Sequence, residues 1–184
     1  MKKTAVVTAL IALSSLHVGA QNVGRFYGEA AYSQLTIKDI SDDSLGTFKP
    51  SAIRLTFGNV LMDNLAVEGF ILQGLSGESK RYNNATIDIN LQTSYGLAIR
   101  PFMNVNEAVE LYGRLGTVKA KNKVVVTSST FTETLSDSTT HSLYGAGLAY
   151  KLADNMKVVF DYTKLSTKND AKSSLISVGV RYNF

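Results

Sequence analysis

Apolar and polar residues alternate along several long stretches of the chain, and this two-residue period is typical of β-strands. The clearest stretch covers residues 86–100, where every second residue from Ile87 to Ile99 is apolar or aromatic, with Thr93 as the exception. The residues between them are polar, small or charged. At 15 residues the stretch is much longer than the about 5–6 residues usual for strands of globular proteins. We therefore predict an all-β protein with long strands.

Seven further stretches follow the same pattern, so that the chain has eight predicted strands in total. The other seven are residues 24–37, 53–58, 67–72, 109–115, 142–152, 156–163 and 175–184. Short connections rich in Asp and Asn alternate with long ones rich in Ser, Thr, Asn, Asp and Lys. The long connections are residues 39–50, 74–84, 118–140 and 166–172. This arrangement predicts an eight-stranded antiparallel up-and-down β-barrel with short turns at one end and long loops at the other.

The first twenty residues have the three-part layout of a secretory signal peptide. A cationic start at Lys2 and Lys3 is followed by an apolar run over residues 4–16, and Val18-Gly19-Ala20 offers small residues for cleavage. We therefore divide the chain into a signal peptide, residues 1–20, and a barrel domain, residues 21–184. Cleavage removes two of the 19 basic residues and leaves 17 against 15 acidic ones. This small excess argues against nucleic acid as a partner.

Alternation alone leaves open whether the apolar face of the barrel points inward, as in soluble lipocalin-type barrels, or outward into lipid. The distribution of charge favours the outward arrangement, because arginines lie within strands on the polar face whereas most lysines lie in loops. Arginine suits enclosed pairing with carboxylates, and an unpaired buried charge costs about 3–5 kcal/mol. We predict an ionic network inside a transmembrane barrel. Its members are Arg25, Glu29, Arg54, Glu68, Asp88, Arg100, Glu110, Arg114, Lys157, Asp161 and Arg181.

Side-chain size and aromatic placement point the same way. The polar face carries many Gly, Ala, Ser and Thr residues, which suit the narrow interior of an eight-stranded barrel. Aromatic residues recur near strand ends on the apolar face, as in the belts at the two interfaces of a membrane. They are Phe26, Tyr32, Tyr144, Tyr150, Tyr182 and Phe184.

The C-terminus carries a motif of known type. Ser177, Gly179, Tyr182 and Phe184 occupy the positions of a polar residue, a glycine and two aromatic residues, third from last and last. This resembles the C-terminal assembly signal of bacterial outer-membrane proteins. Together with the signal peptide and the turns, the chain from residue 21 to 184 is similar to the small eight-stranded barrels of the opacity-protein and OmpA-transmembrane-domain type.

The resemblance implies a location in the outer membrane of a Gram-negative bacterium, with both termini and the short turns in the periplasm. It implies contact with outer-membrane lipid and lipopolysaccharide, and insertion by periplasmic chaperones and the barrel-assembly machinery. Relatives serve as adhesins, serum-resistance factors or envelope-stabilising proteins, and the fold does not select among these roles.

The sequence offers little catalytic chemistry. There is no Cys, no metal-ligand motif and no phosphate loop, so we expect no cofactor, no metal and no enzymatic activity. His141 and Ser142 are adjacent and would point to opposite faces of a strand. A Ser–His pair needs hydrogen-bond reach, so these two residues do not make one.

The longest connection, residues 118–140, is the candidate for surface binding. Lys119, Lys121 and Lys123 precede a β-prone segment that contains Phe131 and could extend the barrel wall outward as a hairpin. These residues could bind lipopolysaccharide phosphates, a host protein or another surface protein. The alternative is a group of rim cations near lipid headgroups.

Three functions therefore remain. We favour a non-enzymatic surface barrel whose outer loops act in adhesion, host interaction or envelope integrity. A lipid A-modifying enzyme is one alternative, and a small narrow pore is another, although an eight-stranded lumen filled with ion pairs leaves no wide channel.

Overall fold

The computed structural model describes residues 24–38, 46–82, 85–128, 132–166 and 172–184, and it is built from β-strands. The predicted signal peptide and Phe131 lie outside these residues. The strands are β1 Phe26–Lys38, β2 Thr47–Phe48, β3 Ser51–Met62, β4 Leu65–Ser76, β5 Glu78–Tyr82, β6 Ala85–Leu91, β7 Ser94–Asn104, β8 Val109–Ser128, β9 Thr132–Ala153, β10 Met156–Ser166 and β11 Lys172–Asn183.

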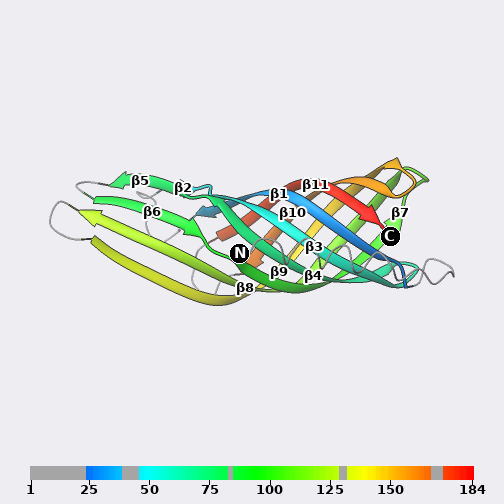
Figure 1. The fold of residues 1–184 in the computed structure, drawn as a ribbon, viewed down its shortest axis with the longest axis horizontal. Coiled ribbons are helices and arrows are strands. Elements are labelled where there is room, and N and C mark those ends of the chain that lie inside the picture. Colours follow the sequence, from blue (N-terminus) through cyan, green and yellow to red (C-terminus); the bar gives the residue numbers. More distant parts are fainter. Residues whose placement is uncertain (1–23, 39–45, 83–84, 129–131, 167–171) are drawn as a thin grey trace, which may run out of the picture.

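Eight of these strands form a closed antiparallel barrel (Figure 1). In chain order they are β1, β3, β4, β7, β8, β9, β10 and β11, each paired with its neighbour. The barrel closes where β1 pairs with β11, from Tyr27 opposite Asn183 to Lys38 opposite Lys172. This confirms the predicted up-and-down topology. The short turns and the C-terminus lie at one end of the barrel, which is the right-hand end in Figure 1.

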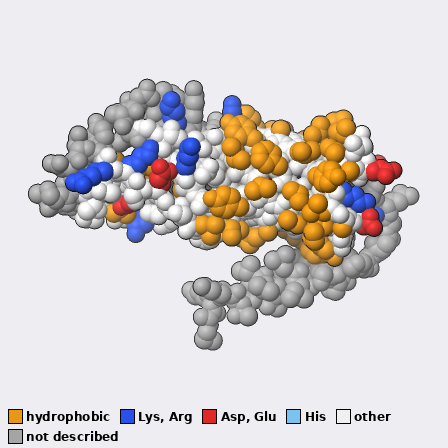
Figure 2. All heavy atoms as spheres, turned by 90° about the horizontal axis from the view of Figure 1, so that it is seen from above, with side chains coloured by type: hydrophobic (Ala, Val, Ile, Leu, Met, Phe, Trp, Pro, Cys, Tyr) orange, Lys and Arg blue, Asp and Glu red, His pale blue; other side chains and the backbone are white. Residues whose placement is uncertain are grey.

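The apolar face of the barrel points outward. Side chains such as Leu97 (67% exposed) and Phe160 (51%) lie on the outside, whereas their neighbours Ala98 and Asp161 point inward and are buried. Figure 2 shows apolar side chains as a band across the visible face of the barrel, with charged residues toward both ends of the molecule. Since water would not tolerate a continuous apolar belt of this extent, the lipid-facing arrangement holds and the lipocalin arrangement is wrong.

The described residues contain no helix that is long and apolar enough to cross a membrane.

A small sheet continues the barrel wall outward. Strands β8 and β9 run for 20 and 22 residues and stay paired as far as Thr127 opposite Thr132. The outer part of β8 also pairs with β6, and β6 pairs with β5. We call this four-stranded unit, made of β5, β6 and the outer halves of β8 and β9, the outer sheet. The expected outward hairpin is therefore present, with two further strands added to it.

The outer sheet corrects one prediction. Residues 86–100 do not form one strand, because the chain breaks at Gln92 and Thr93, between β6 and β7. Before the break the chain belongs to the outer sheet, and after it the chain joins the barrel wall next to β4. At the break the Leu91 carbonyl comes so close to Gly74 that a Cβ on Gly74 would lie 1.9 Å from it. Close approach of two backbones is a common reason for glycine within a strand.

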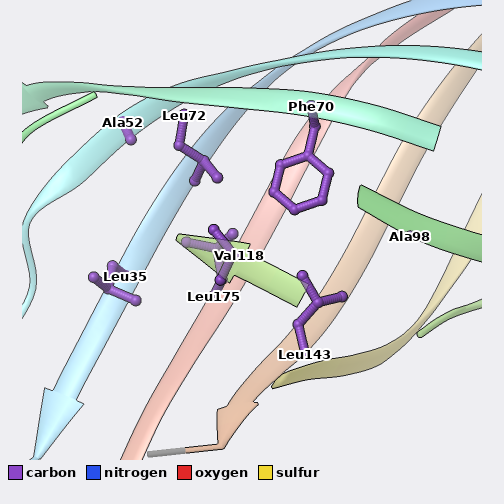
Figure 3. Packing of buried hydrophobic residues seen from close by; sticks show 8 residues of the cluster. All are labelled: Leu35, Ala52, Phe70, Leu72, Ala98, Val118, Leu143 and Leu175. Atoms are coloured by element: carbon purple, nitrogen blue, oxygen red, sulfur yellow. The ribbon is translucent and has the colours of Figure 1, made fainter. Parts of the chain in front are cut away.

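The lumen has two layers of different character. The layer on the side of the short turns is ionic and is described below. The layer on the side of the outer sheet is apolar, with side chains from seven wall strands that point toward one another (Figure 3). Its buried members are Leu35, Ala52, Phe70, Leu72, Ala98, Val118, Leu143 and Leu175. This apolar layer was not among the predictions from the sequence.

Candidate functional site

A cluster of charged side chains crosses the lumen, and Arg114 lies at its centre. Its Nε atom is 2.6 Å from Glu68, Nη1 is 3.1 Å from Asp161, and Nη2 is 3.5 Å from Glu29. The arginine comes from β8 and the three carboxylates come from β4, β10 and β1. Alternation on each strand directs these side chains inward, so a single guanidinium links four strands of the barrel wall.

The other arginines extend the cluster toward both ends of the barrel. Arg54 donates to Glu29 at 2.9 Å and to Asp161 at 2.5 Å. Arg181 donates to Glu29 at 2.9 Å and lies 3.1 Å from Glu110. All five side chains are almost fully buried. Charge-assisted hydrogen bonds of this kind are about twice as strong as neutral ones, and each carboxylate here is met by more than one cation.

The cluster ends near the short turns at Glu110. This carboxylate lies 2.5 Å from Arg100 and 2.5 Å from the amine of Lys157, which is the most exposed member of the group. Among the described residues, the cluster holds four arginines and Lys157 against four carboxylates, so that it carries one net positive charge. We call these nine residues the ionic cluster: Glu29, Arg54, Glu68, Arg100, Glu110, Arg114, Lys157, Asp161 and Arg181.

Two buried tyrosines complete the ionic cluster and were not among the predicted site residues. Tyr27 donates its hydroxyl to Glu68 at 2.7 Å, and Tyr112 donates to Asp161 at 3.2 Å. The guanidinium carbon of Arg100 lies 3.8 Å from the centre of the Tyr112 ring, close enough for a cation–π interaction. A signal was available in the sequence, since Tyr112 alternates with Glu110 and Arg114 on the polar face of its strand.

The structure brings nine of the eleven predicted network residues together and leaves two apart. Arg25 precedes β1 and is exposed, and it follows the turn at Gly24, which has a φ of 89°. Asp88 lies in β6 of the outer sheet and accepts a hydrogen bond from Ser79. Both predictions were wrong. Each residue has the position in the alternation that predicts an inward side chain, but each lies outside the strands of the barrel wall.

The chemistry of the ionic cluster is structural. Its carboxylates are held by guanidinium groups and tyrosine hydroxyls, and no group of three or more possible metal ligands of the His, Cys, Asp and Glu types occurs in the described part of the chain. His141 and Ser142 point to opposite sides of β9, and the Nδ1 atom of His141 lies 3.3 Å from the Ser166 carbonyl oxygen. This arrangement does not supply an activated nucleophile.

The predicted surface lysines lie on the outer sheet. Lys119, Lys121 and Lys123 occupy alternate positions of β8, so all three side chains point to the side that continues the lipid-facing surface. Their partners on β9 are hydroxyl residues, from Thr140 opposite Lys119 to Ser136 opposite Lys123. We call these three residues the lysine row. The row begins at the outer edge of the apolar band, where Lys119 is opposite Tyr95 on β7.

The residues of the C-terminal motif divide between the two faces of β11. Ser177 is buried in the lumen and is hydrogen-bonded to Ser33 at 2.9 Å. Tyr182 and Phe184 lie on the outside near the short-turn end, with ring centres 5.4 Å apart. Gly179 lies against β1, where a Cβ would be 2.3 Å from the Ala30 carbonyl oxygen. The motif therefore lies at the seam where the barrel closes.

Comparisons with known proteins agree with this architecture. A family model described as outer membrane protein beta-barrel domain matches residues 5–184. The attachment invasion locus protein of Yersinia enterocolitica is 28% identical over 191 aligned residues, with all of both chains covered. The protein of the same name from Yersinia pseudotuberculosis is 29% identical, covering all of this chain and 98% of that protein.

Solved structures show the same fold. The attachment invasion locus protein of Yersinia pestis, crystallised with the heparin analogue sucrose octasulfate, is 26% identical with a TM-score of 0.63, over 88% of this chain and 99% of that chain. Neisserial surface protein A is 21% identical with a TM-score of 0.58, over 86% of this chain and 97% of that one, and supports the fold alone.

Proposed function

This chain belongs to the outer membrane protein beta-barrel domain family, and we propose on that basis that it attaches the bacterial cell to anionic polysaccharide on host surfaces. The barrel anchors the protein in the outer membrane, and the outer sheet carries the contact surface. The observation that carries this proposal is the lysine row, three cations that point to one side of a sheet beyond the membrane.

The geometry of the lysine row suits a linear polyanion. Alternate residues of one strand lie about 7 Å apart, so the three ammonium groups form a line that leads away from the membrane edge. Among the described residues on this face of the outer sheet, the acidic side chain is Asp88, which is engaged by Ser79. Positive charge therefore dominates the face, and hydroxyl groups on β9 flank it as hydrogen-bond partners.

The relatives support the same kind of partner. Two of them are named for attachment and invasion, and the Yersinia pestis protein was crystallised with a heparin analogue, which is a sulfated sugar. Sulfate groups and exposed lysines attract one another without any precise fit, and the attraction weakens as salt screens it. The proposal involves no catalytic step.

Two further sets of partners belong to this proposal. Lys119 lies across from Tyr95 at the outer edge of the apolar band, within the zone where lipopolysaccharide phosphates would lie, and we propose that these phosphates contact it. We also propose that periplasmic chaperones and the barrel-assembly machinery insert the chain, using the residues of its C-terminal motif.

The test is attachment of cells that display the protein to a heparin-coated surface. A variant with Lys119→Gln, Lys121→Gln and Lys123→Gln should bind about tenfold less, while Lys151→Gln, a neutralised lysine near the short turns, should bind like the unaltered protein. Gel mobility with and without boiling verifies that each variant forms the barrel. Equal attachment by the triple variant and the unaltered protein would refute the proposal.

A further inference from the structure

A cavity lies in the outer half of the lumen, between the ionic cluster and the outer rim of the barrel. Its volume is ≈ 70 Å³, which is several times the ~10–15 Å³ that one water molecule needs. Side chains from all eight strands of the wall line the cavity, so it lies on the axis of the barrel. Several strands contribute two successive inward residues, such as Leu35 and Ile37 on β1. Two residues of a strand span about 7 Å, and this sets the depth of the cavity.

The wall of the cavity is apolar. Leucine, valine and phenylalanine side chains from different strands point toward one another around it (Figure 3). Its buried apolar residues include Leu35, Phe70, Leu72, Val118, Leu143 and Leu175. Ala120, the next inward residue after Val118 on β8, contributes only a methyl group. The side chains of the wall therefore do not fill this part of the lumen.

The polar side chains of the wall are engaged with the backbone. Ser94 donates to the Gln92 carbonyl at 3.3 Å and accepts the backbone N–H of Lys121 at 3.1 Å. The Nδ1 atom of His141 lies 3.3 Å from the carbonyl oxygen of Ser166. Ser173 adds one hydroxyl near the rim, and a single hydroxyl is fewer than the about 2–4 polar partners that a buried water molecule uses. The cavity is therefore a poor site for ordered water.

The floor of the cavity belongs to the ionic cluster, whose charges are paired with one another. Arg54 donates to Glu29 at 2.9 Å and to Asp161 at 3.0 Å. Arg114 donates to Glu68 at 2.6 Å and to Asp161 at 3.1 Å. The Nε–H of Arg54 has no acceptor among the described residues, but it is itself buried and is not offered to the cavity. A charged guest would lose its hydration here without meeting an uncommitted group of opposite charge.

We propose that this cavity binds a small uncharged hydrocarbon, such as a single aromatic ring with a short substituent. Apolar cavities lined by leucine, isoleucine and phenylalanine stay dry and bind guests of this class. The guest replaces empty space by dispersion contacts with the side chains of the wall. The volume corresponds to roughly five to seven heavy atoms, and a depth of about 7 Å suits one ring.

The guest enters from the side of the outer sheet. Toward the short turns the ionic cluster fills the lumen with buried ion pairs. Toward the outer sheet the lining residues Ile37, Leu91 and Leu165 are only half-buried. The site is also separate from the lysine row, because the lysines and the lining residues of β8 lie on opposite faces of that strand. It therefore does not depend on the proposed attachment function.

The test uses the full barrel in lipid nanodiscs and three probes that share one ring and one attached carbon: toluene, benzoate and benzylammonium. Methyl NMR signals of Leu35, Leu72 and Leu175 report on the cavity, and the signal of Leu148 on the lipid-facing side reports on partition into lipid. Saturable shifts of the cavity methyls with toluene, and none with either charged probe, are the expected result. If a charged probe binds as tightly as toluene, or only Leu148 responds to toluene, the proposal is wrong.

A cavity-filling variant places the guest in the lumen. Ala120→Leu fills the cavity from β8 and should weaken toluene binding about tenfold. Ala146→Leu is the matched control, since it makes the same change at an exposed, lipid-facing position of β9, and it should leave the affinity unchanged. Leu143→Phe fills the cavity from β9 and serves if Ala120→Leu fails to form a barrel. Unchanged toluene affinity in a folded, cavity-filled variant would overturn the proposal.

Discussion

The ring of Tyr27 lies directly over Gly58, its partner across strands β1 and β3. A Cβ on Gly58 would be 2.1 Å from the Tyr27 ring, and the three nearest atoms to that position all belong to Tyr27. The glycine therefore leaves the space in which the tyrosine lies flat against the wall and donates to Glu68. The same arrangement recurs on β8 and β9, where Tyr112 lies over Gly147.

We expect Gly58→Ala to lower the free energy of unfolding by about 1–3 kcal/mol, because an added methyl group forces the tyrosine ring out of place. Urea unfolding of the barrel in micelles measures the effect. Gly69→Ala is the matched control, since the nearest atom to its Cβ would be Leu97 Cδ2 at 3.7 Å, an ordinary contact. In the double variant with Tyr27→Ala the two losses should not add, and strict additivity would contradict the explanation.

Arg114→Met should destabilise the barrel by about 3–5 kcal/mol, because it leaves buried carboxylates without their shared cation. The affected groups are Glu29, Glu68 and Asp161. The free energy of unfolding in urea is again the measurement. Lys151→Met removes an exposed ion pair with Asp154 near the short turns and should be neutral by comparison. Equal stability of the two variants would show that the ionic cluster does not hold the barrel together.

The unaltered protein should show no large, steady conductance in a planar lipid bilayer. The ionic cluster crosses the lumen with contacts between buried groups of opposite charge, such as Arg54 with Asp161 and Arg100 with Glu110. An ion that enters from either side meets charges that are already paired. A stable open channel in the recording would mean that the cluster rearranges, and it would favour the pore hypothesis.

Attachment to a heparin-coated surface should weaken as ionic strength rises. The lysine row is solvent-accessible, with Lys119 and Lys121 exposed, and exposed charges are screened beyond about 10 Å at 0.1 M salt. Attachment that is measured from low to physiological salt should therefore fall steadily, and the triple lysine variant should lose most of this dependence. A salt response that is identical in the variant would assign attachment to another surface.

Phe184→Ala should reduce the fraction of chains that reach the outer membrane as folded barrels. The Phe184 ring contacts Tyr182, and its backbone N–H donates to the Phe26 carbonyl at the seam between β1 and β11. Phe160→Ala is the control, since Phe160 is an exposed lipid-facing aromatic residue outside the C-terminal motif. Heat-modifiable gel mobility of outer-membrane fractions separates the outcomes, and equal yields would argue against an assembly role for the C-terminal motif.

The period-two pattern sufficed to predict the barrel wall and its inverted polarity. Leu97 and Arg100 alternate correctly, because each wall strand has one face toward lipid and one toward the lumen. The same alternation predicts which charged side chains point into the lumen and form the ionic cluster. The pattern could not show where a strand leaves the wall, which is why Asp88 was misplaced. Residues on both sides of the break at Gln92 keep the same alternation in the sequence, and the break is seen only in the pairing of β6 with β8 and of β7 with β4.

The apolar layer of the lumen could not be predicted from the sequence for a different reason. Leu35 on β1 and Leu143 on β9 are distant along the chain, and on their own strands each has apolar or aromatic residues near it on both faces. The inward direction of Leu35 follows from the alternation, since it lies six residues from Glu29 on β1. Which inward residues meet in one layer depends on the register with neighbouring strands, which is a tertiary property. Tyr27 was missed because a tyrosine on a membrane barrel suggests an interface, whereas here a facing glycine gives it a buried position.

The seam between β1 and β11 joins the two extremes of the folded domain, with Tyr27 opposite Asn183. The cylinder cannot close until β11 has been synthesised. A chain that stops before β11 would retain two open sheet edges. The backbone N–H and C=O groups of these edges would be unpaired, and the hydrocarbon core of a membrane does not tolerate this. Quality control is therefore inherent in the topology, since only a chain that contains both β1 and β11 can enter the bilayer stably.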